Sequence, residues 1–182
     1  MKSIPTIIKG CHIFTPDVFR DNRGYFTVSY NAQLLKDLIG KDISFVQDNH
    51  SYSTYGVLRG LHFQKPPYHQ TKLVRCPFGK VLDVVVDIDR NSETYGKHIS
   101  VELSEDNMSM ILVPNTCAHG FVVLSESAIF QYKVDNYYNK ESEDSIVYND
   151  LDLGIDWKIP QSDIVIADKD RFAKTFRDLI FD

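Results

Sequence analysis

Strict alternation of apolar and polar positions marks the middle of this chain. It is clearest at residues 81–89, VLDVVVDID. One face of this segment carries Leu82, Val84, Val86 and Ile88, and the other carries Asp83, Val85, Asp87 and Asp89. A repeat of two residues is typical of a β-strand, because successive side chains point to opposite faces of a sheet. We therefore predict a strand over residues 80–88, with Asp83 as a carboxylate on a largely apolar segment.

Strand-like segments with short turns between them fill most of the chain. Besides residues 80–88, they are residues 45–51, 57–63, 72–76, 98–103, 109–114, 119–124 and 128–138. Many short strands at close spacing predict an all-β fold, an antiparallel sandwich or barrel of the jelly-roll type. The chain shows no low-complexity linker, charge block or solenoid repeat, so we predict one domain over residues 1–182.

Helical patterns are confined to the periphery. Residues 31–39, NAQLLKDLI, place four aliphatic side chains on one stripe, with Asn31 as a cap and Gly40 as the end. Residues 17–30 read as a turn that leads into a strand. Residues 170–180 carry four apolar side chains at helical spacing: Phe172, Phe176, Leu179 and Ile180. We predict a short helix there, packed on the outside of the barrel.

Composition narrows the class of protein. A formal net charge of -5 over 182 residues argues against a nucleic-acid partner, although a few local cations would still bind a small anion. The three cysteines have no zinc-like spacing, and an odd count favours a reduced cytoplasm over a disulfide framework. No apolar run approaches the roughly 20 residues of a membrane span. We therefore expect a soluble cytoplasmic protein with no membrane partner.

Residues 56–76, GVLRGLHFQKPPYHQTKLVRC, hold an unusual number of cations and imidazoles for two predicted strands. Strict alternation would separate Arg59 from His62, but glycines are where strands bulge, and a bulge at Gly60 would bring both to one cavity. An ordinary, fully hydrogen-bonded strand histidine is the simpler interpretation of His62. The cations around it favour a general base, because imidazole titrates near neutral pH.

Other chemical candidates stay open at this point. Lys72 and Arg75 differ by an odd offset, so one faces inward and one outward. His119 is either a solvent-exposed strand end or part of a site. Asp83 needs a partner if it is buried, and a histidine would suit it. Tyr132 is either a cavity wall or a general acid.

A metal site is not predicted. Metal-binding barrels of this kind supply an HxH pair, whereas this chain reads His62, Phe63 and Gln64, and a neutral amide is a poor replacement for imidazole. We find no phosphate-binding glycine loop and no GxSxG motif, which excludes P-loop and serine-hydrolase chemistry.

Eight stretches in order resemble one known family over nearly the whole length. They are FRDNRGYF, FVQDNHS, GVLRGLHFQ, KLVRC, GKVLDVVVDI, AHGFVVLS, YKVDNYY and NDLDLGIDW. The chain is similar to the dTDP-4-dehydrorhamnose 3,5-epimerases. The resemblance implies a cupin-type jelly roll, a homodimer, a nucleotide-linked 4-keto-6-deoxyhexose as substrate, and no metal or organic cofactor. It implies epimerisation at carbons 3 and 5 through an enolate.

The resemblance also implies roles for four catalytic residues. His62 matches the base, and Asp170 matches the carboxylate that pairs with it. Tyr132 matches the acid on the far side of the sugar. Lys72 matches the cation near the keto oxygen, where it would stabilise the enolate.

Substrate-binding residues are implied in the same way. Arg59 matches a diphosphate contact, which suits a guanidinium fork. His119 matches a pocket residue, and Asp83 matches a carboxylate that would orient it. The positions that match the nucleotide end are Arg23, Gln47, Asn49 and Tyr138.

One position departs from the family pattern. Val28 stands where the family usually has a glutamate near the nucleotide. The nucleotide carrier therefore stays open, and dTDP is the first choice. Single-centre epimerisation of another 4-keto sugar, such as a heptose, is the main alternative. A keto-sugar isomerase, a non-catalytic nucleotide-sugar-binding barrel and a metal-dependent oxygenase are weaker alternatives.

Overall fold

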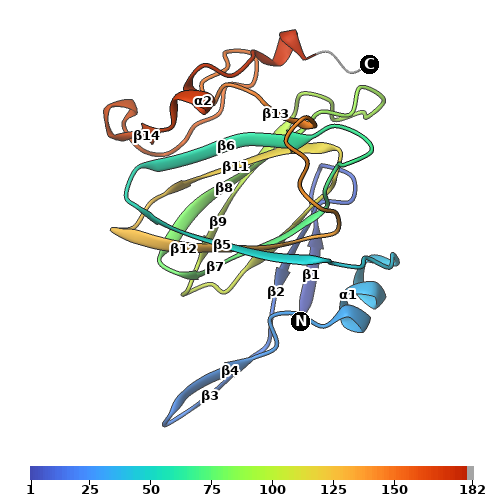
Figure 1. The fold of residues 1–182 in the computed structure, drawn as a ribbon. Coiled ribbons are helices and arrows are strands. Elements are labelled where there is room, and N and C mark those ends of the chain that lie inside the picture. Colours follow the sequence, from blue (N-terminus) through green and yellow to red (C-terminus); the bar gives the residue numbers. More distant parts are fainter. Residues whose placement is uncertain (180–182) are drawn as a thin grey trace.

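Two sheets packed face to face make up most of the structure, a computed structural model that describes residues 1–179 (Figure 1). The first sheet has the order β1–β2–β10–β7–β12–β5. Its strands are β1 (Lys2–Pro5), β2 (His12–Thr15), β10 (Met110–Val113), β7 (Lys72–Phe78), β12 (Ser127–Val134) and β5 (Gln47–Thr54). Neighbouring strands in this sheet are antiparallel.

The second sheet has the order β13–β6–β11–β8–β9, and β14 also pairs with β6. Its strands are β13 (Glu143–Ser145), β6 (Val57–Gln64), β11 (Cys117–Val123), β8 (Lys80–Asp87), β9 (His98–Ser104) and β14 (Val165–Ile166). The described residues also include the helices α1 (Ala32–Ile39) and α2 (Asp168–Arg171), and the 3-10 turns Gln161–Asp163 and Phe176–Asp178. No helix in this part of the chain is long and apolar enough to cross a membrane.

The predicted all-β jelly-roll barrel with short peripheral helices is confirmed. All eight segments predicted as strands form β5 to β12, with ends that differ by up to four residues. The largest difference is at the end of β12, which stops at Val134. The chain turns at Asp135, whose carboxylate accepts a hydrogen bond from the Thr71 amide at 2.7 Å.

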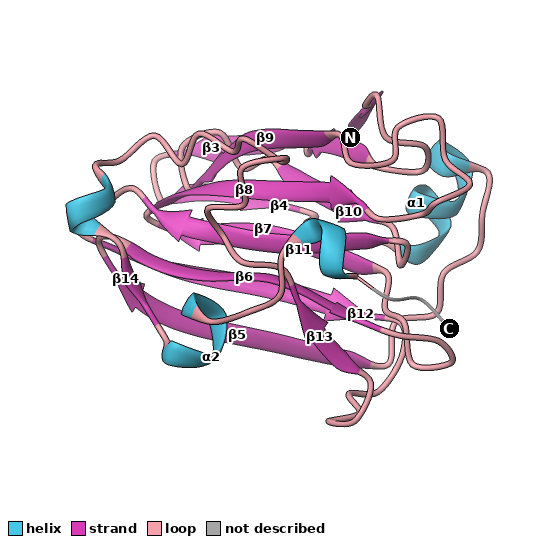
Figure 2. Cartoon of the chain, turned by 90° about the horizontal axis from the view of Figure 1, so that it is seen from above, coloured by secondary structure: helices cyan, strands magenta, loops and turns pink. Residues whose placement is uncertain are grey.

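Strand β8 is buried on both faces, which explains its nearly continuous apolar sequence. Its inward side chains join the core between the two sheets, which includes Val81, Val85, Phe121 and Phe130. Its outward side chains pack under the C-terminal segment, in a second cluster that includes Leu82, Val84, Val86, Trp157 and Leu179. The C-terminal segment thereby crosses back over the second sheet and places α2 beside β6 (Figure 2).

The helix predicted over residues 31–39 is confirmed as α1. The Asn31 carboxamide accepts a hydrogen bond from the Leu34 amide at 2.9 Å, which caps the N-terminus. Gly40 ends the helix with φ 70°, and its amide donates to the Lys36 carbonyl at 2.8 Å. Leu35 is the buried residue that fastens the helix to the barrel.

The single strand predicted within residues 17–30 is instead a hairpin of β3 (Val18–Asp21) and β4 (Gly24–Thr27). The hairpin projects away from the barrel (Figure 1). Phe19, Tyr25 and Phe26 are between 53% and 65% exposed on it. Asn22 and Arg23 form its turn, between the paired residues Asp21 and Gly24. The sequence signals a turn here but does not distinguish it from the start of a lone strand.

The prediction of a helix over residues 170–180 is wrong. The chain forms α2 and then a separate 3-10 turn, with a parallel backbone bridge between Lys174 and Ile146 in between. This bridge holds the backbone extended and interrupts the helical repeat. Phe172 is therefore 79% exposed, whereas Leu179 is 2% exposed. Ile180 lies outside the described residues.

We expect Val122→Ala to destabilise the protein without changing its chemistry. Val122 is fully buried in the outer cluster and points away from the interior of the barrel. Removing two methyl groups from such a site costs roughly 2 kcal/mol of unfolding free energy. Urea unfolding would measure this cost, and a loss below about 0.5 kcal/mol would contradict the tight packing described here.

Candidate active site

A cavity of about 570 Å³ lies between the two sheets and contains most of the residues predicted to be functional. The second sheet contributes Arg59, His62 and His119, and the first sheet contributes Lys72 and Tyr132. Asp170, on α2, closes the cavity from the C-terminal segment. Residues more than 100 positions apart thus meet in one place because the C-terminal segment folds back over β6.

A bulge at Gly60 brings Arg59 and His62 to the same cavity. Along β11, His119 pairs with His62 and Phe121 pairs with Arg59, so three steps on β6 match two steps on β11. The extra residue resets the alternation of β6. The expectation of a bulge at this glycine is confirmed, and it explains how two side chains at an odd offset line one site.

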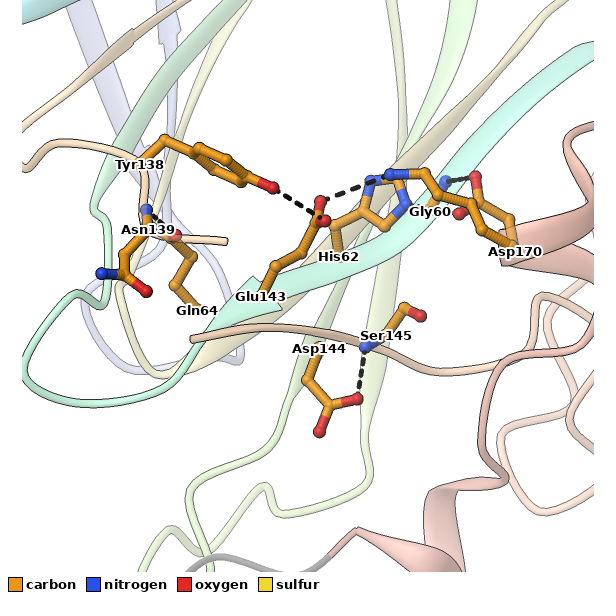
Figure 3. Close-up of polar contacts among 10 residues, drawn as sticks. Gly60, His62, Gln64, Tyr138, Asn139, Glu143, Asp144, Ser145 and Asp170 are labelled. Atoms are coloured by element: carbon orange, nitrogen blue, oxygen red, sulfur yellow. Dashed lines mark hydrogen bonds and ion pairs between the residues drawn. The ribbon is translucent and has the colours of Figure 1, made fainter. Parts of the chain in front are cut away.

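His62 and Asp170 form a hydrogen-bonded pair. The Nε2 of His62 lies 2.7 Å from Oδ1 of Asp170, and the amide of Gly60 donates to Oδ2 at 3.4 Å (Figure 3). Burial opposes ionisation of Asp170, but the hydrogen bond and charge of His62 and the Gly60 amide together hold its pKa below the ordinary value. An ionised carboxylate only accepts hydrogen bonds, so Nε2–H of His62 is the donor in this pair, and Nδ1 is the ring nitrogen that does not contact Asp170.

A second imidazole–carboxylate pair lies deeper in the barrel. The Nε2 of His119 is 2.9 and 3.0 Å from the two carboxylate oxygens of Asp83. Asp83 is fully buried and His119 is 5% exposed, which rules out a solvent-exposed strand end. The ring of His119 stacks near Phe130, with centroids 6.0 Å apart. The expectation that Asp83 partners a histidine is confirmed in geometry.

Lys72 and Arg75 face opposite sides of β7, as their spacing predicts. Lys72 lines the cavity, whereas the Nε of Arg75 donates to Oε1 of Gln131 at 2.9 Å outside it. Burial lowers the pKa of Lys72 from 10.5 to about 8, and the nearby carboxylates of Asp83 and Glu143 oppose this change. The cavity therefore holds a lysine whose charge is sensitive to mildly alkaline pH.

Tyr132 lies on the wall opposite His62. It shares the inner face of the first sheet with Lys72, which pairs with Val134 two residues along β12. Burial raises the pKa of Tyr132 above its ordinary value, the charge of Arg59 opposes this, and Glu143 adds to it. The phenol is therefore protonated at neutral pH and able to donate a proton.

At the mouth of the cavity, Glu143 and Lys169, which sequence reasoning did not assign, form a network with Tyr138, which it placed at the nucleotide end. The hydroxyl of Tyr138 donates to Oε2 of Glu143 at 3.1 Å (Figure 3). Nζ of Lys169 lies 3.4 Å from Oε1 of the same carboxylate. Glu143 and Lys169 both line the cavity. The only sequence signals were that Lys169 precedes Asp170 and that Glu143 follows the Tyr138 segment. Arg59 is also at the mouth, where its guanidinium donates to Ser53 Oγ at 3.2 and 3.3 Å.

The predicted nucleotide-binding residues are only partly gathered here. Gln47 and Asn49 lie on β5 and are joined by a hydrogen bond of 2.7 Å. Asn49 pairs with Tyr132, so it shares the inner face of the sheet. Arg23 lies on the projecting hairpin, where it is ion-paired with Asp21 and its side chain is 85% exposed. The structure does not bring Arg23 to the cavity of its own chain.

Val28 also lies outside the cavity. It is 41% exposed and borders a separate hollow of about 330 Å³ on the outer face of the first sheet, which Arg75 also lines. Val28 is therefore not among the residues that line the cavity with His62 and Lys72.

Gln64, at the position of a second metal ligand in related barrels, has a structural role here. Its amide nitrogen donates to the Tyr68 carbonyl at 2.8 Å, and its oxygen accepts from the Asn139 amide at 2.7 Å. Among residues 1–179, no group of three or more His, Cys, Asp and Glu side chains is placed to hold a metal ion.

A larger hollow of about 650 Å³ borders the loop after β8. Its buried carboxylate, Asp87, accepts hydrogen bonds from Ser92 at 2.5 Å and Thr94 at 2.6 Å. These contacts fix the loop and leave this carboxylate no reactive partner, so the cavity with His62 is the candidate active site.

We expect Lys72 to titrate with a midpoint of about 8, because burial disfavours the ammonium ion. The unfolded chain then holds this proton more tightly, so the contribution of Lys72 to stability increases as the pH rises from about 8 to 10.5. NMR of protein labelled with ¹³C at the lysine ε carbons would measure the midpoint, with Lys72→Met to assign the signal. A midpoint near 10.5 would contradict the burial of this amine.

Comparison with known proteins identifies the family. The family model described as dTDP-4-dehydrorhamnose 3,5-epimerase matches residues 5–178. A dTDP-4-dehydrorhamnose 3,5-epimerase of Escherichia coli (strain K12) is 48% identical over 181 residues, which cover 99% of this chain and 97% of the relative. The crystal structure of the enzyme of the same name from Elizabethkingia anophelis NUHP1 has a TM-score of 0.94 at 54% identity, covering 98% of this chain and 97% of that chain.

A second solved structure adds a bound sugar nucleotide. A dTDP-6-deoxy-D-glucose-3,5-epimerase of Legionella pneumophila Philadelphia 1, in complex with dTDP-4-keto-L-rhamnose, has a TM-score of 0.94 at 42% identity. The match covers 98% of this chain and 94% of that chain. The chain therefore belongs to the dTDP-4-dehydrorhamnose 3,5-epimerase family of isomerases.

Proposed function

We propose that this chain inverts carbons 3 and 5 of dTDP-4-dehydro-6-deoxyglucose to form dTDP-4-dehydrorhamnose, with His62 as the base and Tyr132 as the acid. The observation that carries the proposal is the placement of these two groups. The His62–Asp170 pair lies on the second sheet's side of one cavity, and the protonated phenol of Tyr132 lies on the first sheet's side. Inversion needs a proton removed from one face of the sugar and returned to the other.

The chemistry starts from the ketone at carbon 4, which acidifies the hydrogens on carbons 3 and 5. Nδ1 of His62 takes the proton, and the Asp170 carboxylate stabilises the imidazolium that forms. Negative charge then develops on the keto oxygen. Lys72, a cation on the inner face of β7, stabilises this charge more than it stabilises the neutral ketone, so it lowers the barrier.

Substrate binding uses the charges around the mouth and the floor of the cavity. Two guanidinium nitrogens of Arg59 donate to Ser53 Oγ, which orients the group, and the guanidinium binds the diphosphate. The Asp83–His119 pair positions an imidazole at the floor, where it binds the sugar. At the nucleotide end we place Gln47, Asn49 and Tyr138.

We further propose that the chain works as a homodimer. Arg23 lies on the hairpin of β3 and β4, which projects away from the barrel of its own chain (Figure 1). The same hairpin carries the exposed side chains of Phe19 and Phe26, and the side chain of Arg23 is itself exposed. A role for Arg23 in nucleotide binding is therefore a role at the cavity of a second copy. We propose a single domain over residues 1–182, a cytoplasmic location and catalysis without a cofactor; the three buried free cysteines are compatible with a reducing compartment.

We expect deuterium from the solvent to enter the substrate at carbons 3 and 5. The experiment incubates dTDP-4-dehydro-6-deoxyglucose with the protein in deuterated water and reads both positions by NMR. His62→Ala removes the base, and exchange should fall by roughly 10²- to 10⁴-fold. Circular dichroism of the variant controls for folding.

Each other outcome of this experiment supports a different function or a different assignment of the base. Label at one carbon only identifies a single-centre epimerase. Tight binding without label favours a binding barrel or another nucleotide carrier, which GDP-, CDP- and UDP-linked substrates would distinguish. Full exchange by His62→Ala would show that the base is wrongly assigned.

Tyr132→Phe should separate proton removal from inversion. The base on the opposite wall is intact, so deuterium should still enter the substrate, whereas epimerised product should fall by about 10²-fold or more. The same NMR spectra report both quantities. Equal loss of exchange and inversion would contradict an acid role confined to the second proton transfer.

A further inference from the structure

Strands β6 and β11 approach each other unusually closely at two glycines beneath both histidines. A methyl group built on Gly60 would lie 2.5 Å from the Cα of Gly120 and 2.7 Å from the carbonyl oxygen of His119. One built on Gly120 would lie 2.8 Å from the carbonyl oxygen of Arg59. These distances are too short for a real side chain. The close contact between the backbones of β6 and β11 at Gly60 and Gly120, called the crossing below, therefore exists only because both positions are glycine.

The two glycines are required for different reasons. Gly60 has φ 122°, a conformation that other residues rarely adopt, and it also lacks space. Gly120 has no such backbone requirement and lacks only space, because Arg59, Gly60 and Leu61 surround it. Gly120 therefore allows the crossing to be tested without introducing backbone strain at the substituted residue.

The crossing lies directly behind the catalytic pair. The bulge at Gly60 turns both the His62 ring and the Gly60 amide toward Asp170, at 2.7 and 3.4 Å respectively (Figure 3). On the other strand, His119 immediately precedes Gly120 and is held by Asp83. Any separation of the two strands at this point moves His62 relative to its carboxylate.

We propose that Gly120 is a positioning residue, whose missing side chain lets β11 hold the Gly60 bulge in the geometry that places His62 and the Gly60 amide on Asp170. Gly120 does not touch the reacting atoms and acts through β6. The proposal rests on the proposed role of His62 as the base. It adds that the position of His62 relative to Asp170 depends on the contact between the backbones of β6 and β11.

Gly120→Ala tests the proposal, with Val122→Ala as the matched control. Val122 is two residues along the same strand but packs in the outer cluster, so its truncation destabilises the barrel without entering the crossing. Misplacing a catalytic group by about 1 Å costs on the order of 10²-fold in rate. We therefore expect kcat for exchange to fall roughly 10²-fold in Gly120→Ala with little change in KM, and to stay within about twofold in Val122→Ala.

A spectroscopic measurement reports on the geometry without reference to turnover. In ¹⁵N-histidine-labelled protein, the Nε2–H signal of His62 should shift or broaden in Gly120→Ala and remain unchanged in Val122→Ala. This signal still tests the crossing if His62→Ala shows that the base is wrongly assigned. Wild-type kcat and an unchanged His62 signal in Gly120→Ala would overturn the proposal, as would an equal loss of kcat in the control.

If Gly120→Ala does not fold, a measurement that keeps both glycines still tests the proposal. The Gly60 amide faces Asp170, so its ¹H and ¹⁵N shifts should move in Asp170→Asn, and the Gly120 amide across the crossing should move with it. Shifts that stay at their wild-type values for both glycines would show that the crossing and the catalytic pair are independent, and would overturn the proposal.

Discussion

The need to give every buried charge a partner shapes the interior of this barrel. Asp83 is fully buried and Asp170 is 3% exposed, and each would carry a large desolvation penalty alone. Each instead bonds a histidine that faces the cavity. Among the described residues, no buried side-chain nitrogen or oxygen lacks a hydrogen-bond partner. The same pairing that makes these carboxylates tolerable in the core also fixes the orientation of the two imidazole rings.

Local patterns in the sequence were sufficient to predict the barrel. The period of two along β8 reflects the different composition of its two faces, because one face carries mostly aliphatic side chains and the other mixes valines with the carboxylates of Asp83 and Asp87. The odd offset between Lys72 and Arg75 placed them on opposite faces by the same period of two. At Gly60 the pattern conflicted with the chemistry, and the conflict located the bulge that the structure contains. The break in alternation at Gly60 thus predicted a structural feature, just as the regular alternation along β8 did.

Long-range geometry was beyond those patterns. His62 and Asp170 are 108 residues apart, and only the return of the C-terminal segment over β6 brings them within hydrogen-bonding distance. The family resemblance named Asp170, whereas its own segment showed only helical periodicity, which the backbone bridge at Lys174 overrides. Glu143 had no distinguishing neighbours in sequence; it became a candidate because β13 pairs with β6 and faces the cavity.

The two-sheet architecture divides the proposed chemistry between its walls. Packed sheets lie about 10 Å apart, which leaves room for one sugar ring between side chains that project from both. The second sheet supplies both histidines, and the first supplies Tyr132 and Lys72, so a ring held between them meets a base on one face and an acid on the other. Of the groups assigned to the nucleotide, Gln47 and Asn49 lie on β5 of the first sheet, and Arg23 lies on the projecting hairpin. Val28 borders a separate hollow, so the departure from the family pattern at this position does not change the set of residues that line this cavity.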